Sequence, residues 1–188
     1  EVRSNEVKAV VIDRSRFDRA CSERAVQEGA DILTGTEFLG FEREGKRLSV
    51  KVRGPDGPMS IGADLLVGAD GYKSMVGKAA GIGPAKDLVR GIQADLDMKM
   101  DDQSMVEVHI GRNVAPGFFA WVLPCRDFTR VGLGVSNGNG TPSSYLTNFL
   151  KNKGLENVKR LRTVSGVIPI GPPQKTYADH VLIAGDAA

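Results

Sequence analysis

The sequence predicts a mixed α+β and α/β fold in which an α/β scaffold is interrupted by a mostly antiparallel sheet. Two short, unbroken apolar runs, at residues 7–13 and 181–184, are typical of buried strands. Between them, from residue 88 onward, strand-like runs follow one another with turns and no intervening helix, which favours antiparallel pairing. These changes of pattern predict three segments, 1–87, 88–170 and 171–188. The third contains a buried-strand pattern like that of the first.

The first segment begins with a strand followed by a helix. After the run at 7–13, the pattern changes to a helical period that begins near Ser15, with Asp18 three residues later as in a capping box. Gly29 stands where such a helix would end. One apolar stripe is expected to face the core, and it consists of Phe17, Ala20, Cys21 and Ala25.

The rest of the first segment predicts strands joined by turns. Leu48, Val50 and Val52 alternate with polar residues, which is typical of a half-exposed strand. A further buried strand leads into Asp70 and Gly71. The residues after it predict a short helix that ends at Gly81.

The second segment predicts a sheet and one helix. Its strand candidates are 91–100, 104–110, 117–124 and 129–136. Thr141 and Pro142 have the residue types of an N-cap and a first helical position, and Gly154 is expected to end that helix. The apolar stripe of this helix consists of Tyr145, Leu146, Phe149 and Leu150.

Composition narrows the classes of function. Twenty-five basic residues against 23 acidic ones leave a net charge of +2, scattered along the chain, so we expect no nucleic-acid partner. The cysteines, Cys21 and Cys125, have no CxxC spacing, and His109 and His180 have no ligand-spaced companions, so we expect no metal site. No run approaches the ~18 apolar residues of a membrane span. We therefore expect a cytoplasmic location with at most peripheral membrane contact.

Three short motifs place polar groups beside the ends of buried strands. Asp70-Gly71 and Gly185-Asp186 each follow such a strand, at the edge where open α/β sheets bind ligands. The alternatives are a tight turn for the first and a helix-capping aspartate for the second. Arg14, between a strand and a helix, has the side chain best suited to a phosphate, or it makes an ordinary surface salt bridge.

Three aromatic residues lie close together in the second segment. If residues 117–124 form a strand, Phe119 and Trp121 share one face and Phe118 lies on the other. They form either ordinary sheet core or a wall for a flat or apolar ligand.

The motifs taken together carry more information than any one of them. RxxFD before a helix, VGADG, PxxFxWxLP and a closing LIAGDAA occur in this order. The chain resembles the flavoproteins built like para-hydroxybenzoate hydroxylase and, among these, is most similar to the geranylgeranyl reductase family. The resemblance covers essentially all 188 residues. The family motif PxxYxWxFP stands here with two departures, as Pro116, Phe119, Trp121, Leu123 and Pro124.

The resemblance implies a cofactor and its binding residues. Segments 1–87 and 171–188 would be parts of a Rossmann-like FAD-binding domain, interrupted by an antiparallel-sheet substrate domain at 88–170. The residues implied to contact FAD are Arg14, Phe38 (through its backbone), Asp70, Gly71, Gly185 and Asp186. Of these, Asp186 would bind the ribityl chain and Asp70 would lie near the nucleotide end.

The resemblance also implies a substrate wall. The side chains expected there are Phe119, Trp121, Leu123 and Pro124. Because Phe119 replaces the tyrosine of the family motif, a possible hydrogen bond to substrate or flavin is missing.

The implied activity is FAD-dependent reduction of isoprenoid (geranylgeranyl) double bonds in a prenylated lipid or pigment precursor, with an external electron donor. No motif residue is an evident catalytic acid, so the catalytic residues are unassigned. One alternative is an aromatic hydroxylase or halogenase of the same fold, and another is a catalytically inert folded fragment. We expect the chain to be an internal fragment without the GxGxxG unit and the C-terminal region of the family. By itself it would then bind FAD weakly.

Overall fold

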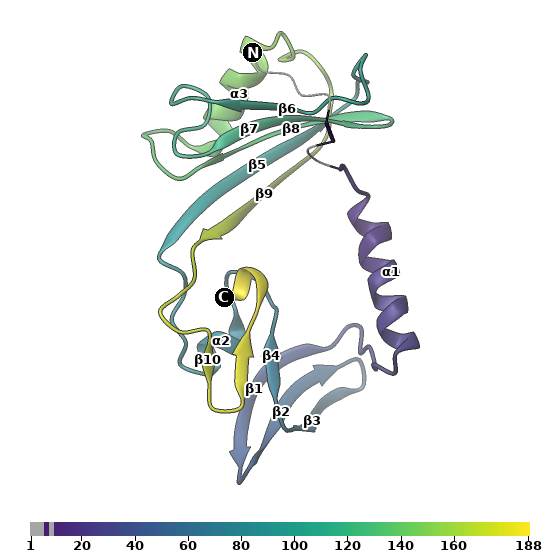
Figure 1. The fold of residues 1–188 in the computed structure, drawn as a ribbon, viewed down its shortest axis with the longest axis vertical. Helices are drawn as coiled ribbons and strands as arrows, with labels where there is room; N and C mark the ends of the chain where they lie inside the picture. The colour runs from purple at the N-terminus through teal and green to yellow at the C-terminus, as the bar shows by residue number, and fades with distance from the viewer. Residues whose placement is uncertain (1–5, 8–9) are drawn as a thin grey trace. The chain divides into compact units, whose positions relative to one another are not determined.

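The computed structural model describes residues 6–7 and 10–188, and Figure 1 shows the order of their helices and strands. The chain forms two compact units. The first, the sheet unit, comprises Val89–Val167 with the N-terminal stretch that ends at Phe17. The second, the small-strand unit, comprises Asp18–Leu88 and Ile168–Ala188. The mixture of helices, antiparallel strand pairs and the parallel pair β4–β11 confirms the predicted α+β fold class.

The sheet unit is built on five strands in the order β6-β7-β8-β5-β9. The pairs β6–β7, β7–β8 and β8–β5 are antiparallel, as the absence of a helix between these sequence runs predicts. The strands are β5 (Asp87–Leu96), β6 (Glu107–Ile110), β7 (Phe119–Cys125), β8 (Phe128–Val135) and β9 (Arg160–Ile170).

Helix α3 (Pro142–Asn152) covers one face of this sheet (Figure 1). It begins as predicted, because the side chain of Thr141 accepts a hydrogen bond from the Ser144 N–H at 3.2 Å. Its buried residues are Leu146, Phe149 and Leu150. They pack against alternate residues of the strands, which are Ala94, Leu96, Ala120, Val122, Val131, Leu133 and Val135. One face of the sheet is therefore core, and the side chains between these positions point to the other face.

The small-strand unit contains two three-stranded sheets. The first is an antiparallel meander of β1 (Glu37–Glu44), β2 (Arg47–Gly54) and β3 (Gly57–Ala63). The second contains β4 (Leu66–Gly68), β10 (Tyr177–Ala178) and β11 (Val181–Ile183), and β4 and β11 run parallel. The parallel pair thus makes the residues that follow β4 and those that follow β11 neighbours at one edge of this sheet.

The core of this unit contains the alternating residues of β2. Leu48, Val50 and Val52 are buried together with Val76 and Val181, which confirms the predicted half-exposed strand. Val76 belongs to helix α2 (Met75–Ala79), which packs very closely on β4. A β-carbon at Gly68 would lie 2.7 Å from Cβ of Val76, so only glycine allows this contact.

The buried strand predicted at 7–13 is not found. Residues 8 and 9 lie outside the described part of the chain, and the described residues of this run have no strand structure. Val10 is 75% exposed and Ile12 is 46% exposed. A strand needs a neighbour that satisfies its backbone groups, and none is paired with the described residues of this run.

Helix α1 (Arg14–Gln27) begins two residues earlier than the capping box predicts. The carboxylate of Asp13 accepts a hydrogen bond from the Arg16 N–H at 3.2 Å, so Asp13 caps the helix and Ser15 lies inside it. Gly29, with φ of 94°, follows the end of the helix as expected. The predicted apolar stripe is not buried, and Phe17 is 52% exposed. No described element packs against the stripe closely enough to bury it.

Among the described helices, none combines the length and the apolar composition that crossing a bilayer requires.

Candidate functional site

The parallel pair β4–β11 brings two predicted motifs to the same edge. Gly68 is the register partner of Ile183, and the Ala184 N–H donates to the Gly68 carbonyl at 2.9 Å. The segments that begin with Asp70 and Gly185 therefore both leave from the carboxyl edge of this sheet, where α/β sheets place ligands.

Asp70 uses its carboxylate to hold the start of helix α2, whose N-cap residue is Ser74. One oxygen accepts from Ser74 Oγ at 2.6 Å, and the other accepts from the N–H groups of Met75 and Val76 at 2.7 and 3.1 Å. Burial raises the pKa of Asp70, but these hydrogen bonds outweigh it and leave that pKa below its ordinary value. These contacts give Asp70 a structural role. Gly71 beside it has φ of 82°, as in the tight turn that the sequence analysis gives as an alternative.

Asp186 has a different environment. It lies in the short 3₁₀ turn η1 (Gly185–Ala187), is exposed, and makes no hydrogen bond or ion pair with the described residues. Gly185 has φ of 64°, and a β-carbon there would have no atom within 4 Å, so the backbone next to Asp186 is open. A free carboxylate beside open backbone suits a ligand with hydroxyl groups, such as a ribityl chain.

Phe38 lies on β1 beside a register shift between Phe38 and Gly40. Its side chain is half-buried against the core of the small-strand unit. A contact between the backbone of Phe38 and a cofactor stays a prediction.

The aromatic residues form a continuous row on the face of the five-stranded sheet that α3 does not cover. Phe118 stacks on Phe119 with ring centroids 4.3 Å apart, and Phe119 meets Trp121 edge-on at 5.9 Å. The prediction that Phe118 faces the opposite way is wrong. Strand β7 begins at Phe119, so strand alternation does not apply to Phe118.

Two glycines of β8 lie beneath these rings. A β-carbon at Gly132, the register partner of Trp121, would lie 2.5 Å from Cζ2 of the indole. A β-carbon at Gly134 would lie equally close, at 2.5 Å, to Cδ1 of Phe118. The rings therefore pack directly on the backbone, and we call Phe118, Phe119, Trp121, Gly132 and Gly134 the aromatic face.

The other two predicted substrate residues, Leu123 and Pro124, lie on opposite faces of the sheet. Leu123 is half-buried and alternates with Trp121, so it shares the aromatic face. Pro124 is buried on the opposite side, as the register partner of the buried Thr129. The geometry thus groups Leu123 with the rings and sets Pro124 apart from them.

A cavity of about 1350 Å³ lies at the turn between β7 and β8, within the sheet unit. Arg14 and Pro124 line it, together with residues for which the sequence predicts no role, chiefly Asp95 and Arg130. Asp95 is only 8% exposed and accepts from Nε and Nη2 of Arg130 at 2.7 and 3.1 Å. These hydrogen bonds raise the pKa of Arg130 above its ordinary value. The two residues are 35 positions apart and meet only through the β5–β8 register.

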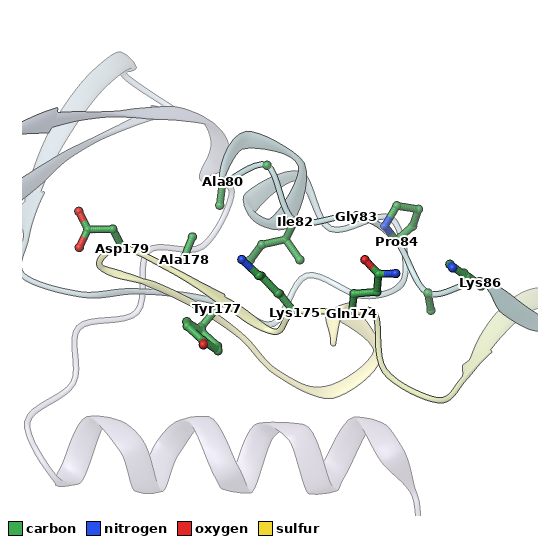
Figure 2. A pocket seen from close by; sticks show the side chains of 12 residues that line it. Ala80, Ile82, Gly83, Pro84, Lys86, Gln174, Lys175, Tyr177, Ala178 and Asp179 are labelled. Carbon is green, nitrogen blue, oxygen red and sulfur yellow. The ribbon is translucent and has the colours of Figure 1, made fainter.

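A second cavity, of about 810 Å³, lies in the small-strand unit (Figure 2). Its walls come from the loop 80–86 and from residues 174–179, with Lys86 and Lys175 among them. None of the residues predicted for cofactor or substrate lines this cavity.

Among the described residues, no group of three or more His, Cys, Asp or Glu side chains is arranged to hold a metal ion.

Comparison with known proteins supports the motif analysis. The family model described as "FAD binding domain" matches residues 2–145. Digeranylgeranylglycerophospholipid reductase 2 of Methanothermobacter thermautotrophicus is 33% identical over 97% of this chain and 49% of its own length. The chain thus spans about half the length of the curated relatives it matches.

Solved structures share the fold. A geranylgeranyl bacteriochlorophyll reductase-like protein of Thermoplasma acidophilum has a TM-score of 0.85 at 24% identity, over 99% of this chain and 50% of that one. An anhydrotetracycline hydroxylase of Streptomyces rimosus has a TM-score of 0.69 at 20% identity, over 95% of this chain and 37% of that one.

The resemblance to geranylgeranyl reductases is thereby confirmed, and so is the fold class. With more than half of its residues matched by the family model, the chain belongs to the FAD-binding domain family.

Proposed function

We propose that this chain supplies the cofactor-contacting and substrate-contacting parts of an FAD-dependent reductase of isoprenoid double bonds. The single observation that supports this most is the aromatic face, an apolar wall formed by the strand that carries the PxxFxWxLP motif. The names of its relatives point the same way, since they are digeranylgeranylglycerophospholipid reductases. On this proposal, residues 88–170 form the substrate domain, and 1–87 with 171–188 belong to the FAD-binding domain.

The residues at the β4–β11 edge fit the cofactor. The free carboxylate of Asp186 would accept hydrogen bonds from ribityl hydroxyls, and the open backbone at Gly185 would permit close approach. Gly71 and Asp70, whose carboxylate is held by the start of helix α2, would shape the turn beside it, and Arg14 and the backbone of Phe38 would supply further contacts. When bound, FAD supplies the hydride chemistry.

The task of the chain in such a reaction is to hold an alkene in place and to keep water away. Phe119, Trp121 and Leu123 present an apolar surface along which an extended prenyl chain can lie. Trp121 packs on Gly132 and Phe118 on Gly134, and Phe119 stacks on Phe118, so the sheet supports this wall. None of these side chains carries an acidic proton, so the proton that completes alkene reduction would come from another group.

We further propose that the partners are a prenylated lipid or pigment precursor and an external electron donor. The enzyme would work in the cytoplasm, with at most peripheral contact with a membrane.

The direct test is to reduce the FAD-loaded protein without oxygen, add a geranylgeranyl lipid, and follow its mass. A gain of about two mass units per double bond, with reoxidation of the flavin, is the expected result. Trp121→Ala should lower turnover by about 100-fold and leave the flavin bound, since a misplacement of about 1 Å costs that much. Full turnover in Trp121→Ala would contradict the assignment of this face to the substrate.

A second test concerns the cofactor residues. Asp186→Ala should weaken FAD binding more than Asp70→Ala, because the contacts of Asp70 are made within the chain. Loss of a charge-assisted hydrogen bond corresponds to about 1.5–3 kcal/mol. Flavin dissociation constants in the reverse order would overturn the assignment of Asp186.

An aromatic hydroxylase or halogenase remains the second candidate, because a solved hydroxylase shares the fold. Oxygen uptake by the reduced protein, dependent on an aromatic compound and with no alkene reduced, would favour it. If neither an alkene nor oxygen is consumed, the remaining alternative is a catalytically inert module.

A further inference from the structure

The cavity at the β7–β8 turn carries excess positive charge. Five arginines and three aspartates line it. Each aspartate already has a cationic partner within 4 Å: Asp13 pairs with Arg16 at 3.7 Å, Asp127 with Lys99 at 3.2 Å, and Asp95 with Arg130 at 2.7 Å. The acidic side chains are therefore neutralised before any ligand enters.

Two arginines at the cavity have no such partner. Arg126, in the β7–β8 turn, and Arg162, on β9, make no ion pair or hydrogen bond through their side chains with the described residues. Both guanidinium groups are exposed and positively charged. Both therefore add positive charge to the cavity lining that no acidic side chain among the described residues balances.

Arg130 adds a preorganised donor group. Asp95 uses two of its five N–H groups, and the guanidinium lies over the Phe128 ring at 5.4 Å. The other three N–H groups have no acceptor among the described residues, while the side chain is already held in one position. Little conformational entropy would be lost when Arg130 binds an anion.

The aromatic face begins where this cavity ends. Gln93 lines the cavity, and its Cβ would lie 2.7 Å from a β-carbon at Gly132, beneath the Trp121 ring. A single surface of the sheet unit therefore runs from three arginines, past Gln93, to a row of aromatic rings. Its chemistry complements a molecule that has an anionic group at one end and an apolar chain at the other.

We propose that Arg126, Arg130 and Arg162 bind the phosphate group of an amphiphilic ligand whose apolar chain lies along the aromatic face. Arginine is the side chain best matched to phosphate oxygens. The assignment of the apolar chain to a prenyl substrate rests on the proposed function, whereas the phosphate site rests on the cavity and its charges. Phosphate could also reach the arginines as the diphosphate of FAD, so the experiment separates these two sources.

Binding to the full protein is measured by calorimetric titration with geranylgeranyl monophosphate and with geranylgeraniol, each with and without saturating FAD. We expect the phosphate to bind about tenfold more tightly than the alcohol at low salt, with the difference shrinking as ionic strength rises. FAD should leave this preference unchanged.

Variants identify the residues responsible. Arg162→Gln and Arg126→Gly should each weaken binding of the monophosphate about fivefold and leave binding of the alcohol unchanged, as expected when one exposed charge contact is lost. Arg112→Gln is the matched control, because Arg112 is also an exposed arginine of the sheet unit but does not line the cavity. It should bind both ligands like the parent protein.

Three results would overturn the proposal: equal affinities for phosphate and alcohol, equal effects of Arg112→Gln and Arg162→Gln, or abolition of phosphate binding by saturating FAD. The last would assign the arginines to the diphosphate of the cofactor. Failure of the proposed reductase activity is distinguishable from these results, because head-group preference in binding does not require any double bond to be reduced.

Discussion

Replacing Gly132 by alanine should destabilise the sheet unit through the aromatic face. The new β-carbon would lie 2.5 Å from Cζ2 of Trp121 and 2.7 Å from Cβ of Gln93. Carbon atoms pack best at about 3.5–4.0 Å, so one or both neighbours must move by about 1 Å. Gln93 offers little relief, because its Cβ is attached to the backbone of the adjacent strand. We therefore expect a loss of about 2–3 kcal/mol, in the upper part of the range for overpacking.

Gly91→Ala is the matched control for this substitution. Gly91 lies on the adjacent strand β5, and a β-carbon there would meet its nearest atoms at 3.8 Å, an ordinary contact. We expect Gly91→Ala to change the free energy of unfolding by less than about 1 kcal/mol.

The measurement is urea unfolding followed by far-UV circular dichroism, with hydrogen exchange of the β8 amides to assign the loss to the sheet unit. In a Trp121→Ala background, the cost of Gly132→Ala should fall by about 1 kcal/mol, because one of its two close contacts is gone. If Gly132→Ala and Gly91→Ala have the same stability, the rings do not pack on this backbone and the reasoning is refuted.

Three further substitutions test the structure. Leu146→Ala, in the core beneath α3, should lower the free energy of unfolding by about 2–5 kcal/mol, and a loss under about 1 kcal/mol in chemical denaturation would contradict the core assignment. Asp70→Ala should cost about 1 kcal/mol as a lost helix cap. Because the folded-state pKa of Asp70 is lowered, its contribution is present above its unfolded-state pKa of about 4 and disappears as the pH falls through the folded-state value. Denaturation of both proteins from pH 7 to pH 2 should show the difference between them shrinking, and a constant difference would exclude the cap. Arg126→Gly should raise stability by about 1 kcal/mol, since Arg126 has φ of 60°, and an unchanged melting temperature would count against strain at this turn.

Local pattern was sufficient for much of the fold. The helix that starts at Thr141, the half-exposed strand of Leu48, Val50 and Val52, and the antiparallel strands after residue 88 all follow from periods of two or 3.6 residues and from capping chemistry. Such signals lie within a few neighbouring residues, so no tertiary information is needed to see them.

Local sequence pattern gave wrong predictions where the structure depends on a pairing strand or on the residue at which a strand begins. The apolar run around Val10 is an excellent strand by composition, but its described residues pair with no other strand. Phe118 belongs to the predicted strand by sequence, but it lies one residue before β7 begins and so stacks on Phe119. Element boundaries of this kind depend on tertiary hydrogen bonds that the local sequence does not encode.

For the candidate site, the sequence by itself identified the residue types: aspartates after buried strands, glycines beside them, and aromatic residues in a motif strand. Only the three-dimensional structure distinguished the two aspartates, because Asp70 accepts from Ser74 and from the first turn of helix α2, while Asp186 has no partner among the described residues. It also decided that Arg130 meets Asp95 and that Trp121 lies over Gly132. The physical reason is strand register: pairing joins residues tens of positions apart, and a shift of one residue would exchange the faces of the sheet.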